Sequence, residues 1–171
     1  MKKNLLIFAI ISFTTFCANA ADIDASYKNS VSIQFGINGA TQSKNSFELQ
    51  FFPPDLSYAR EIYEGEFYDI STSTFYDNIS VKVRDTNFSY RVGQRMDFGI
   101  KIRNYIPYVT IGLGIIRSQH HYQTSPVYGA GLLTKITKRF LWVNEINFQD
   151  VRYQQTYATI ANLSTGIVYN F

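Results

Sequence analysis

Few residues of this chain have side chains suited to catalysis. The only two histidines, His120 and His121, are adjacent. Hydroxyl side chains follow or precede them at Ser118, Thr124 and Ser125. A histidine that activates a nucleophile must lie within hydrogen-bond reach of it. The spacing does not match, because Gln123 stands where a His-x-Ser pair would need serine, and Glu145 is far along the chain. We therefore interpret the two histidines as an exposed loop pair and predict no catalytic residues.

Motifs for cofactors and metals are also missing. The histidine pair has no cysteine beside it, and the only cysteine is Cys17. Zinc sites combine several such ligands at characteristic spacings. The sequence has no phosphate-binding glycine loop, dinucleotide fingerprint or haem attachment motif. We predict no cofactor and no metal site.

A second group of reactive side chains follows a strict alternation. Between Phe88 and Arg103, one face of an extended strand carries Arg91, Arg95, Asp97 and Lys101 together with Ser89, Gly93, Gly99 and Arg103. The other face is Phe88, Tyr90, Val92, Gln94, Met96, Phe98, Ile100 and Ile102. Alternation with period two is typical of a β-strand whose faces meet different surroundings.

The same alternation recurs in other segments. Counting back from Phe171 by twos gives Tyr169, Ile167, Thr165, Leu163, Ala161, Thr159 and Tyr157, opposite a mostly small or polar face. Further apolar faces are Val31, Ile33, Phe35 and Ile37; Phe47, Leu49 and Phe51; and Val109, Ile111, Leu113 and Ile115. The strands are ten to sixteen residues long, which suits a membrane better than a compact sandwich.

Composition agrees with an all-β class. The chain has 171 residues, with 14 Phe and 13 Tyr against one Trp, and 46% apolar residues. This aromatic content argues against disorder, and a single cysteine excludes a disulfide scaffold. Aromatic residues favour strands over helices.

The first twenty residues resemble an export signal. Lys2 and Lys3 form a basic start, an apolar stretch runs from Leu5 to Phe16, and residues 18–20 read Ala-Asn-Ala. This order predicts a secretory signal peptide over residues 1–20. A mature chain of residues 21–171 would carry 14 basic and 13 acidic residues, a net charge of +1. Such a chain has no basic surface for nucleic acid and no apolar run for a membrane helix.

Several motifs in order indicate a family. They are Pro107-Tyr108-Val109, Gly112-Leu113-Gly114, Tyr128-Gly129-Ala130-Gly131 and the terminal residues 166–171. Together with the export signal they resemble the small outer-membrane β-barrel proteins of OmpA/OmpX type. The resemblance implies a single transmembrane barrel over residues 21–171, in the outer membrane of a Gram-negative bacterium. It also implies that Ile167, Tyr169 and Phe171 form the signal that the barrel-assembly machinery recognises.

We predict an eight-stranded antiparallel up-and-down barrel. Its strands would begin with Ile23–Tyr27, Ser30–Ala40 and Phe47–Phe52 and continue from Phe88 to the C-terminus, with tight turns at 103–105 and 137–139. Loops at 119–125 and 150–156 would lie outside the cell. The segment Pro53–Asn87 would be a long external excursion, with a short helix that starts at Pro53-Pro54-Asp55 and ends at Gly65, and with a weakly alternating stretch over Phe75–Val83 that could be a strand. A ten-stranded barrel that uses hairpin arms from this segment is the alternative.

The lumen and the excursion supply the candidate sites. We expect a lumen ion-pair network of Glu48, Arg91, Arg95, Asp97, Lys101, Lys135 and Glu145, with Glu145 or Glu48 paired to Arg91 and Arg95, because an eight-stranded lumen holds only its own side chains. Candidate external contacts are Tyr58, Tyr63, Tyr68 and Tyr76, which exposed on the excursion would offer large contact area.

These expectations define a structural and surface-interaction role for a monomer. Its partners would be outer-membrane lipid, lipopolysaccharide, the assembly machinery and a host or cell-surface ligand reached by adhesion. Three other readings stay open: a lipid A acyl hydrolase or transferase that uses His121, a narrow ion channel, and a soluble periplasmic β-protein whose apolar faces point inward.

Overall fold

The structure, a computed structural model, describes residues 29–41, 50–51, 54–83, 86–118, 121–153 and 156–171. Within this part the chain forms β-strands and no helix. The strands are β1 (Asn29–Thr41), β2 (Gln50–Phe51), β3 (Asp55–Glu64), β4 (Tyr68–Val83), β5 (Thr86–Ile100), β6 (Tyr105–Ser118), β7 (Tyr122–Lys135), β8 (Phe140–Tyr153) and β9 (Thr156–Asn170). The predicted export signal, Cys17, the first strand predicted at 23–27 and Glu48 lie outside the described residues.

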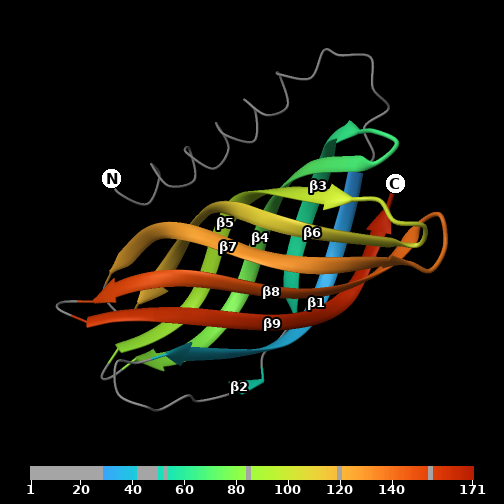
Figure 1. Ribbon diagram of the computed structural model, residues 1–171. Coiled ribbons are helices and arrows are strands. Elements are labelled where there is room, and N and C mark those ends of the chain that lie inside the picture. Colours follow the sequence, from blue (N-terminus) through green and yellow to red (C-terminus); the bar gives the residue numbers. More distant parts are fainter. Residues whose placement is uncertain (1–28, 42–49, 52–53, 84–85, 119–120, 154–155) are drawn as a thin grey trace.

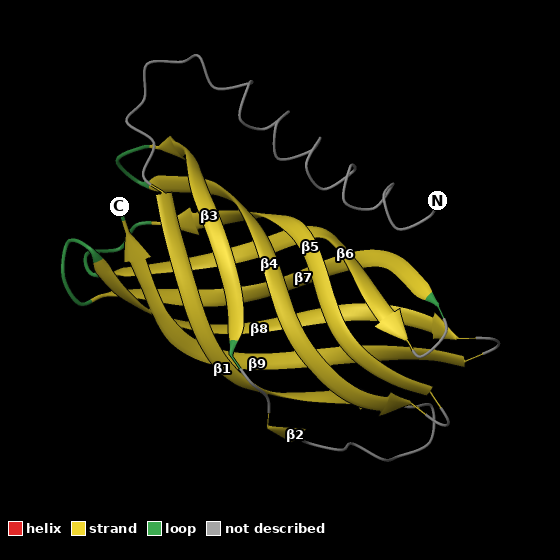
Figure 2. Cartoon of the chain, turned by 180° about the vertical axis from the view of Figure 1, so that it is seen from behind, coloured by secondary structure: helices red, strands yellow, loops and turns green. Residues whose placement is uncertain are grey.

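Eight of these strands close into an antiparallel barrel (Figures 1 and 2). Each strand from β3 to β9 pairs with its successor, and β1 pairs with both β3 and β9. The closing seam runs from Ser30↔Asn170 to Thr41↔Thr159. At the end of the seam, Asn29 and Phe171 exchange backbone hydrogen bonds of 3.0 and 2.8 Å. The predicted eight-stranded all-β barrel is therefore confirmed, and the ten-stranded alternative is wrong.

The short strand β2 lies outside this ring. It pairs with β1 at Ile37 and Asn38, whereas β3 pairs with β1 from Asn29 to Gln34. Both therefore follow the same edge of β1, one after the other. The sequence Pro53-Pro54 separates them, and proline has no backbone N–H to donate to a strand ladder.

The two ends of the barrel differ in what they hold. Asn29 and Phe171 lie at one end, which we call the terminal end, with the links β3–β4, β5–β6 and β7–β8 (Figure 1). The link after β5 is closed by an isolated bridge between Ile102 and Tyr105 and turns at Arg103, whose φ is 54°. At the opposite end, two residues separate β4 from β5 and β8 from β9, and three separate β6 from β7. The longer stretch 42–54, which includes β2, joins β1 to β3 at this end.

The segment 53–87 is not an external excursion, and residues 54–65 are not a helix. Residues 55–64 and 68–83 form two strands of the wall. Alternation is weak there because Thr72 and Thr74 face outward, while the inward face carries small Ser71 and Ser73. A register shift between Glu61 and Tyr63 breaks the period further. The contrast between the two faces was therefore too low to reveal β3, and in β4 only the second half, 75–83, alternated enough to be considered a strand.

The outer surface of the wall is apolar. Val31, Ile33, Phe35, Val109, Ile111, Leu113, Leu163 and Ile167 are all more than a third exposed, as their alternation predicted. Toward the terminal end the outward aromatic residues are Tyr63, Tyr68, Tyr105, Phe140, Trp142, Tyr169 and Phe171. Toward the opposite end they are Tyr90, Tyr122, Phe148 and Tyr157, with Tyr76 and Tyr128 stacked on Tyr90 and Phe148. An apolar band between two aromatic girdles is the exterior of a transmembrane barrel. No helix in the described ranges is long and apolar enough to span a membrane.

Phe88 is the exception on β5. The alternation placed it on the outer face, but its side chain is 2% exposed and lies inside. The register between β5 and β6 shifts between Phe88 and Tyr90, so one extra residue reverses the facing of the strand beyond that point. A bulge of this kind changes which face a side chain joins without any change in the local residue types.

Candidate functional site in the barrel lumen

The middle of the lumen is organised around Arg95 on β5. Its Nη1 and Nη2 donate to Glu145 Oε1 and Oε2 at 2.6 and 2.7 Å, and its Nε lies 3.2 Å from Asp97 Oδ1. Nε also donates to the Ser73 hydroxyl at 3.0 Å. Arg95 is 7% and Glu145 4% exposed, so this bidentate pair is enclosed by the wall. Paired, fork-like contacts of this type are the strongest ion pairs that proteins form.

Glu145 is held from three directions. Besides Arg95, it accepts hydrogen bonds from the Tyr108 hydroxyl on β6 and the Asn147 side-chain amide on β8. Tyr108 reaches it by lying over Gly131 on β7, where an added Cβ would be 2.4 Å from the Tyr108 ring. The glycine therefore makes the space in which the aromatic ring lies.

A second pair lies beside the first. Arg91 is fully buried and donates through Nε to Asp77 Oδ2 at 2.7 Å. The guanidinium carbons of Arg91 and Arg95 lie 5.3 and 5.7 Å from the centre of the Phe75 ring. The ring thus contacts both cations, at a distance at which its π face attracts them.

Asp55, at the start of β3, adds a fourth carboxylate. It accepts hydrogen bonds from the backbone N–H of Asn78 at 3.1 Å and from the side-chain amide of Asn162 at 3.0 Å. Two guanidinium groups therefore share the described mid-lumen with the carboxylates of Asp55, Asp77, Asp97 and Glu145. All are linked by direct hydrogen bonds to strand or side-chain partners.

Toward the opposite end the lumen is filled with aliphatic and aromatic side chains. We call this cluster the apolar plug; it contains Ala40, Ile79, Val81, Phe88, Ile116, Val151, Ala158 and Ile160. Ile79, Ile116 and Ile160 have no exposed surface at all. These side chains come from six strands around the ring, so the plug closes the lumen across its width.

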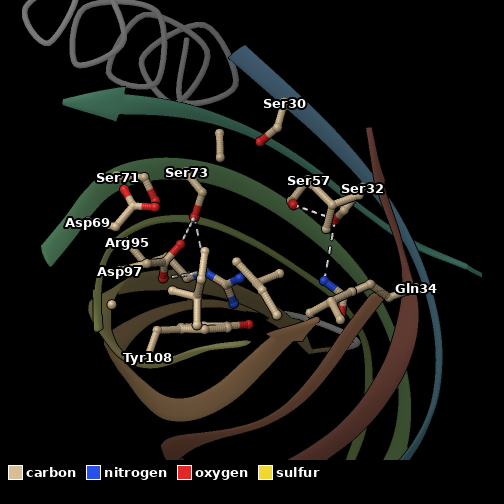
Figure 3. A pocket seen from close by; sticks show the side chains of 16 residues that line it. Ser30, Ser32, Gln34, Ser57, Asp69, Ser71, Ser73, Arg95, Asp97 and Tyr108 are labelled. Atoms are coloured by element: carbon tan, nitrogen blue, oxygen red, sulfur yellow. Dashed lines mark hydrogen bonds and ion pairs between the residues drawn. The ribbon is translucent and has the colours of Figure 1, made fainter. Parts of the chain in front are cut away.

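Toward the terminal end the lumen is asymmetric. Ile106, Tyr108, Leu141, Val143 and Val168 pack together on the wall formed by β6, β8 and β9. The wall formed by β1, β3 and β4 carries Ser30, Ser32, Ser57, Ser71 and Ser73 instead (Figure 3). Between the two walls a cavity of about 80 Å³ reaches Arg95 and Asp97.

This inner cavity continues into a wider one at the mouth of the barrel. The outer cavity, which we call the vestibule, has a volume of about 570 Å³ and shares Ser30, Asp69 and Ser71 with the inner one. Its rim carries Lys135 and an ion pair between Lys101 Nζ and Glu64 Oε1 of 2.7 Å. The described lumen is therefore open from the terminal end to the Arg95 layer and filled beyond it.

The structure brings part of the expected ion-pair network together. Arg95 contacts Glu145 and Asp97 in the mid-lumen, whereas Lys101 and Lys135 lie at the mouth. Arg91 does not pair with Glu145 but with Asp77. Asp55 and Asp77 were missed because their segment was read as external. The two-residue spacing Phe75-Asp77, in phase with Ser71 and Ser73, was the signal that could have revealed an inward face.

The four candidate contact tyrosines belong to the wall and not to an external loop. Tyr58 lies on β3 and Tyr76 on β4, with outward side chains 45% and 42% exposed. Tyr63 and Tyr68 flank the β3–β4 link at the terminal end. Their exposed rings face outward from the barrel within the aromatic and apolar surface. They therefore lie on strands of the barrel or beside a link between them, and their contact with an external ligand stays a prediction.

The C-terminal residues line the outer face of the terminal end. Phe171 is 60% exposed and Ile167 36% exposed. The Tyr169 ring packs 5.1 Å from that of Phe140 and 6.1 Å from that of Phe171. Ile167 and Tyr169 on β9, together with Phe171 directly after it, thus form one outward stripe.

The histidine loop does not assemble a nucleophile. The Ser118 hydroxyl donates to the His121 backbone carbonyl at 2.9 Å and accepts from its N–H at 3.2 Å, so it closes a turn. His120 lies outside the described residues. Among the residues that the structure describes, no group of three metal-binding side chains comes together.

Comparison of the sequence with known proteins finds no matching family model and no matching curated sequence. Comparison of the fold finds solved structures. Neisserial surface protein A is similar with a TM-score of 0.58 at 14% identity, over 86% of this chain and 98% of that one. The attachment invasion locus protein Ail of Yersinia pestis gives 0.53 at 16% identity, over 85% and 100%. A major outer membrane protein of Thermus thermophilus gives 0.51 at 10%, over 86% and 100%.

The fold is therefore that of small outer-membrane β-barrels, as the sequence motifs implied. Each of these structures is matched over nearly its whole length, so the likeness covers the complete barrel. At such low identity the likeness extends to the fold only. Ail was also solved with the heparin analogue sucrose octasulfate, which is a property of that protein.

Proposed function

We propose that this chain is an integral outer-membrane barrel with a structural role, whose lumen is closed by its own side chains. The observation that carries the proposal is the distribution of polarity across the wall. Val109, Ile111 and Leu113 are about 60% exposed on the outside, while Arg91 on the next strand is fully buried inside. In a water-soluble barrel this arrangement would expose the apolar band to water and bury the charges, which is unfavourable on both sides.

The closed lumen is supported by the apolar plug and the paired charges. A continuous aqueous path would have to cross Ile79, Ile116 and Ile160, which have no exposed surface. Below them, Arg91 and Arg95 are each tied to carboxylates. A narrow channel is therefore disfavoured relative to a plugged barrel. A lipid A acyl hydrolase or transferase is also disfavoured, because the Ser118 hydroxyl is occupied by the His121 backbone.

We further propose that the terminal end faces the periplasm. An even number of antiparallel strands places Asn29 and Phe171 at the same end of the barrel, and in outer-membrane barrels of this type that end lies in the periplasm. The stripe of Ile167, Tyr169 and Phe171 lies at this end, where the assembly machinery would read it. The apolar band would be covered by lipid, and nothing in the described wall requires a second subunit, so we propose a monomer.

Fractionation and gel migration test the membrane assignment. We expect the protein to remain in the outer-membrane fraction after carbonate washing and to migrate faster on a gel when it is not heated, because a closed barrel resists detergent unfolding. Recovery in the aqueous periplasmic fraction without heat-dependent migration would contradict the proposal and favour the soluble β-protein.

Planar bilayer recordings test the closed lumen. We expect no stable conductance from the purified, folded protein. Reproducible single-channel currents would overturn the closed-lumen part of the proposal and leave the membrane assignment intact. Incubation with lipopolysaccharide should leave its acyl pattern unchanged in a mass spectrum, and a lost or added acyl chain would show that the enzyme reading was correct.

A further inference from the structure

The outer wall carries two cross-strand rows of tyrosine and arginine at the opposite end. In the first row, Tyr90 on β5 pairs with Arg117 on β6, which in turn pairs with Tyr122 on β7. In the second, Arg152 on β8 pairs with Tyr157 on β9. We call these five residues the arginine–tyrosine patch. Arg117, Tyr122, Arg152 and Tyr157 all have exposed side chains.

The guanidinium groups of the patch are held in place by aromatic rings. The Arg117 Cζ lies 5.5 Å from the centre of the Tyr90 ring, and the Arg152 Cζ lies 5.0 Å from that of Tyr157. The Tyr90 and Tyr122 hydroxyl oxygens are 3.5 Å apart across the first row. A guanidinium has five N–H donors, so those that a neighbouring hydroxyl does not use, such as the Tyr90 hydroxyl beside Arg117, can donate to an anion.

No carboxylate neutralises these two cations within the described part of the chain. The ion pairs found there join Arg91, Arg95 and Lys101 to their partners and do not involve Arg117 or Arg152. The nearest acidic residue along β8 is Asp150, and its carboxylate accepts a hydrogen bond of 2.7 Å from Thr159. The Tyr128 hydroxyl lies 3.5 Å from the same carboxylate.

Position along the wall indicates which anion would meet these cations. Arg117 and Arg152 are the last described outward-facing residues of β6 and β8 at the opposite end, beside or beyond the aromatic girdle. Aromatic girdles mark the boundary between hydrocarbon and headgroups. Side chains at that boundary meet lipid headgroups, whose anionic groups are phosphates.

We propose that the arginine–tyrosine patch binds the phosphates of lipopolysaccharide in the outer leaflet. The inference rests on the proposed function, which makes the opposite end face outward. One strand, β7, separates β6 from β8, so the two arginine-bearing strands are roughly 10 Å apart. Two cations on these neighbouring parts of the wall suit a headgroup that carries two separate phosphates on a rigid sugar backbone, as lipid A does. A glycerophospholipid such as phosphatidylglycerol, in contrast, carries one phosphate.

The test compares two double variants of the full barrel folded in phosphatidylcholine vesicles. R117Q/R152Q removes both cations of the patch. K138Q/R139Q removes two exposed cations from the β7–β8 turn at the terminal end and serves as the control with the same charge change. The readout is the rise in heat-unfolding midpoint, followed by gel migration, as lipopolysaccharide is titrated into the vesicles.

We expect lipopolysaccharide to raise the midpoint of the wild type and of K138Q/R139Q alike. R117Q/R152Q should need roughly thirtyfold more lipopolysaccharide for the same rise, since each basic side chain near an anionic headgroup contributes a several-fold effect. Equal titration curves for R117Q/R152Q and the wild type would overturn the proposal. Enzymatically dephosphorylated lipopolysaccharide should stabilise the wild type far less.

Two further arms separate the remaining outcomes. If phosphatidylglycerol raises the midpoint as effectively as lipopolysaccharide does, the patch is a general anionic-lipid contact and the lipopolysaccharide assignment is wrong. If R117Q/R152Q does not fold, the test uses the wild type alone, with intact and with dephosphorylated lipopolysaccharide. Equal stabilisation of the wild type by the two would overturn the proposal. A wild type that fails to fold into any vesicle contradicts the proposed function itself, whereas a folded barrel without a lipopolysaccharide effect contradicts only this inference.

Discussion

Toward the opposite end, side chains from six strands fill the lumen with hydrocarbon, whereas toward the terminal end the serine-bearing wall of β1, β3 and β4 leaves a cavity. Both regions lie inside the same ring of eight strands. The difference therefore comes from side-chain volume at inward positions. Ile79, Val81 and Phe88 fill space that Ser57, Ser71 and Ser73 do not. The layer of Arg91 and Arg95 separates the two regions.

The comparison teaches that one barrel can be rigid in one half and hydrated in the other. Well-packed regions respond strongly to the loss of a few atoms, while regions that border water can relax or admit solvent. Substitutions with the same chemistry should thus have different effects in the two halves. Four predictions test this, in order of decreasing effect on the free energy of unfolding.

The largest effect is expected at the boundary between the halves. Glu145→Ala removes the carboxylate that accepts from Arg95, Tyr108 and Asn147, and leaves the Arg95 guanidinium with Asp97 alone. Breaking a buried pair by removing one partner costs about 3–5 kcal/mol. Urea unfolding of the barrel folded in vesicles measures the loss. A change below about 1 kcal/mol would show that water reaches this layer freely and that the two halves are not separated there.

The second prediction makes the same type of truncation in each half. Ile116→Ala in the apolar plug should cost about 2–4 kcal/mol, because a fully buried residue leaves a cavity. Leu133→Ala beside the vestibule removes a partly buried side chain and should cost about half as much, because the site already borders open space. Equal losses would contradict the contrast between a packed and an open half.

The third prediction concerns the aromatic ring of Tyr108, which lines the inner cavity. Gly131→Ala places a methyl group 2.4 Å from the Tyr108 ring and should displace the hydroxyl from Glu145, at a cost of about 1–3 kcal/mol. Ala130→Val changes the preceding residue, which faces outward, and its free energy of unfolding should stay within about 0.5 kcal/mol of that of the wild type. The two variants add one and two carbon atoms to opposite faces of β7, so similar losses would indicate that contact with the Tyr108 ring is not the cause.

The smallest effect is expected at the mouth. Glu64→Gln removes the charge that faces Lys101 across 2.7 Å, in a pair whose glutamate side chain is 42% exposed. Solvent-exposed pairs contribute less than about 1 kcal/mol. Chemical unfolding at low and high salt measures it. A loss as large as that of Glu145→Ala would mean that the vestibule excludes water, contrary to its open shape.

The exterior followed from the sequence, and the total of eight strands was right although β3 and β4 were not among the strands that were counted. Strong alternation over 88–103 and 157–171 gave the facing of Arg95, Phe98 and Ile167, because hydrocarbon outside and charges inside demand opposite residue types. The pairing of Arg95 with Glu145 was expected on the same basis and is present.

The apolar plug and the strands β3 and β4 did not follow. The sequence does not distinguish an inward apolar residue from an outward one once a register shift has reversed the alternation. Phe88 is such a residue. In β3 and β4, serine faces the lumen and threonine faces outward, so the two faces differ little in polarity. Which carboxylate meets Arg91 depends on the register between β4 and β5, which pairs Asp77 with Arg91 and is a long-range property.

The seam between β1 and β9 has a kinetic consequence. Each pairing from β3 to β9 joins consecutive strands and can form as a hairpin. β1 and β3 also pair, and only β2 lies between them along the chain. Ser30 and Asn170, by contrast, are partners from near the two ends of the described chain. Local contacts form quickly, whereas closing so long a loop is slow. We therefore expect the barrel to assemble as a growing sheet whose last and slowest step is closure. A sheet still open at β1 and β9 would have two unprotected edges at which catalysed insertion could act.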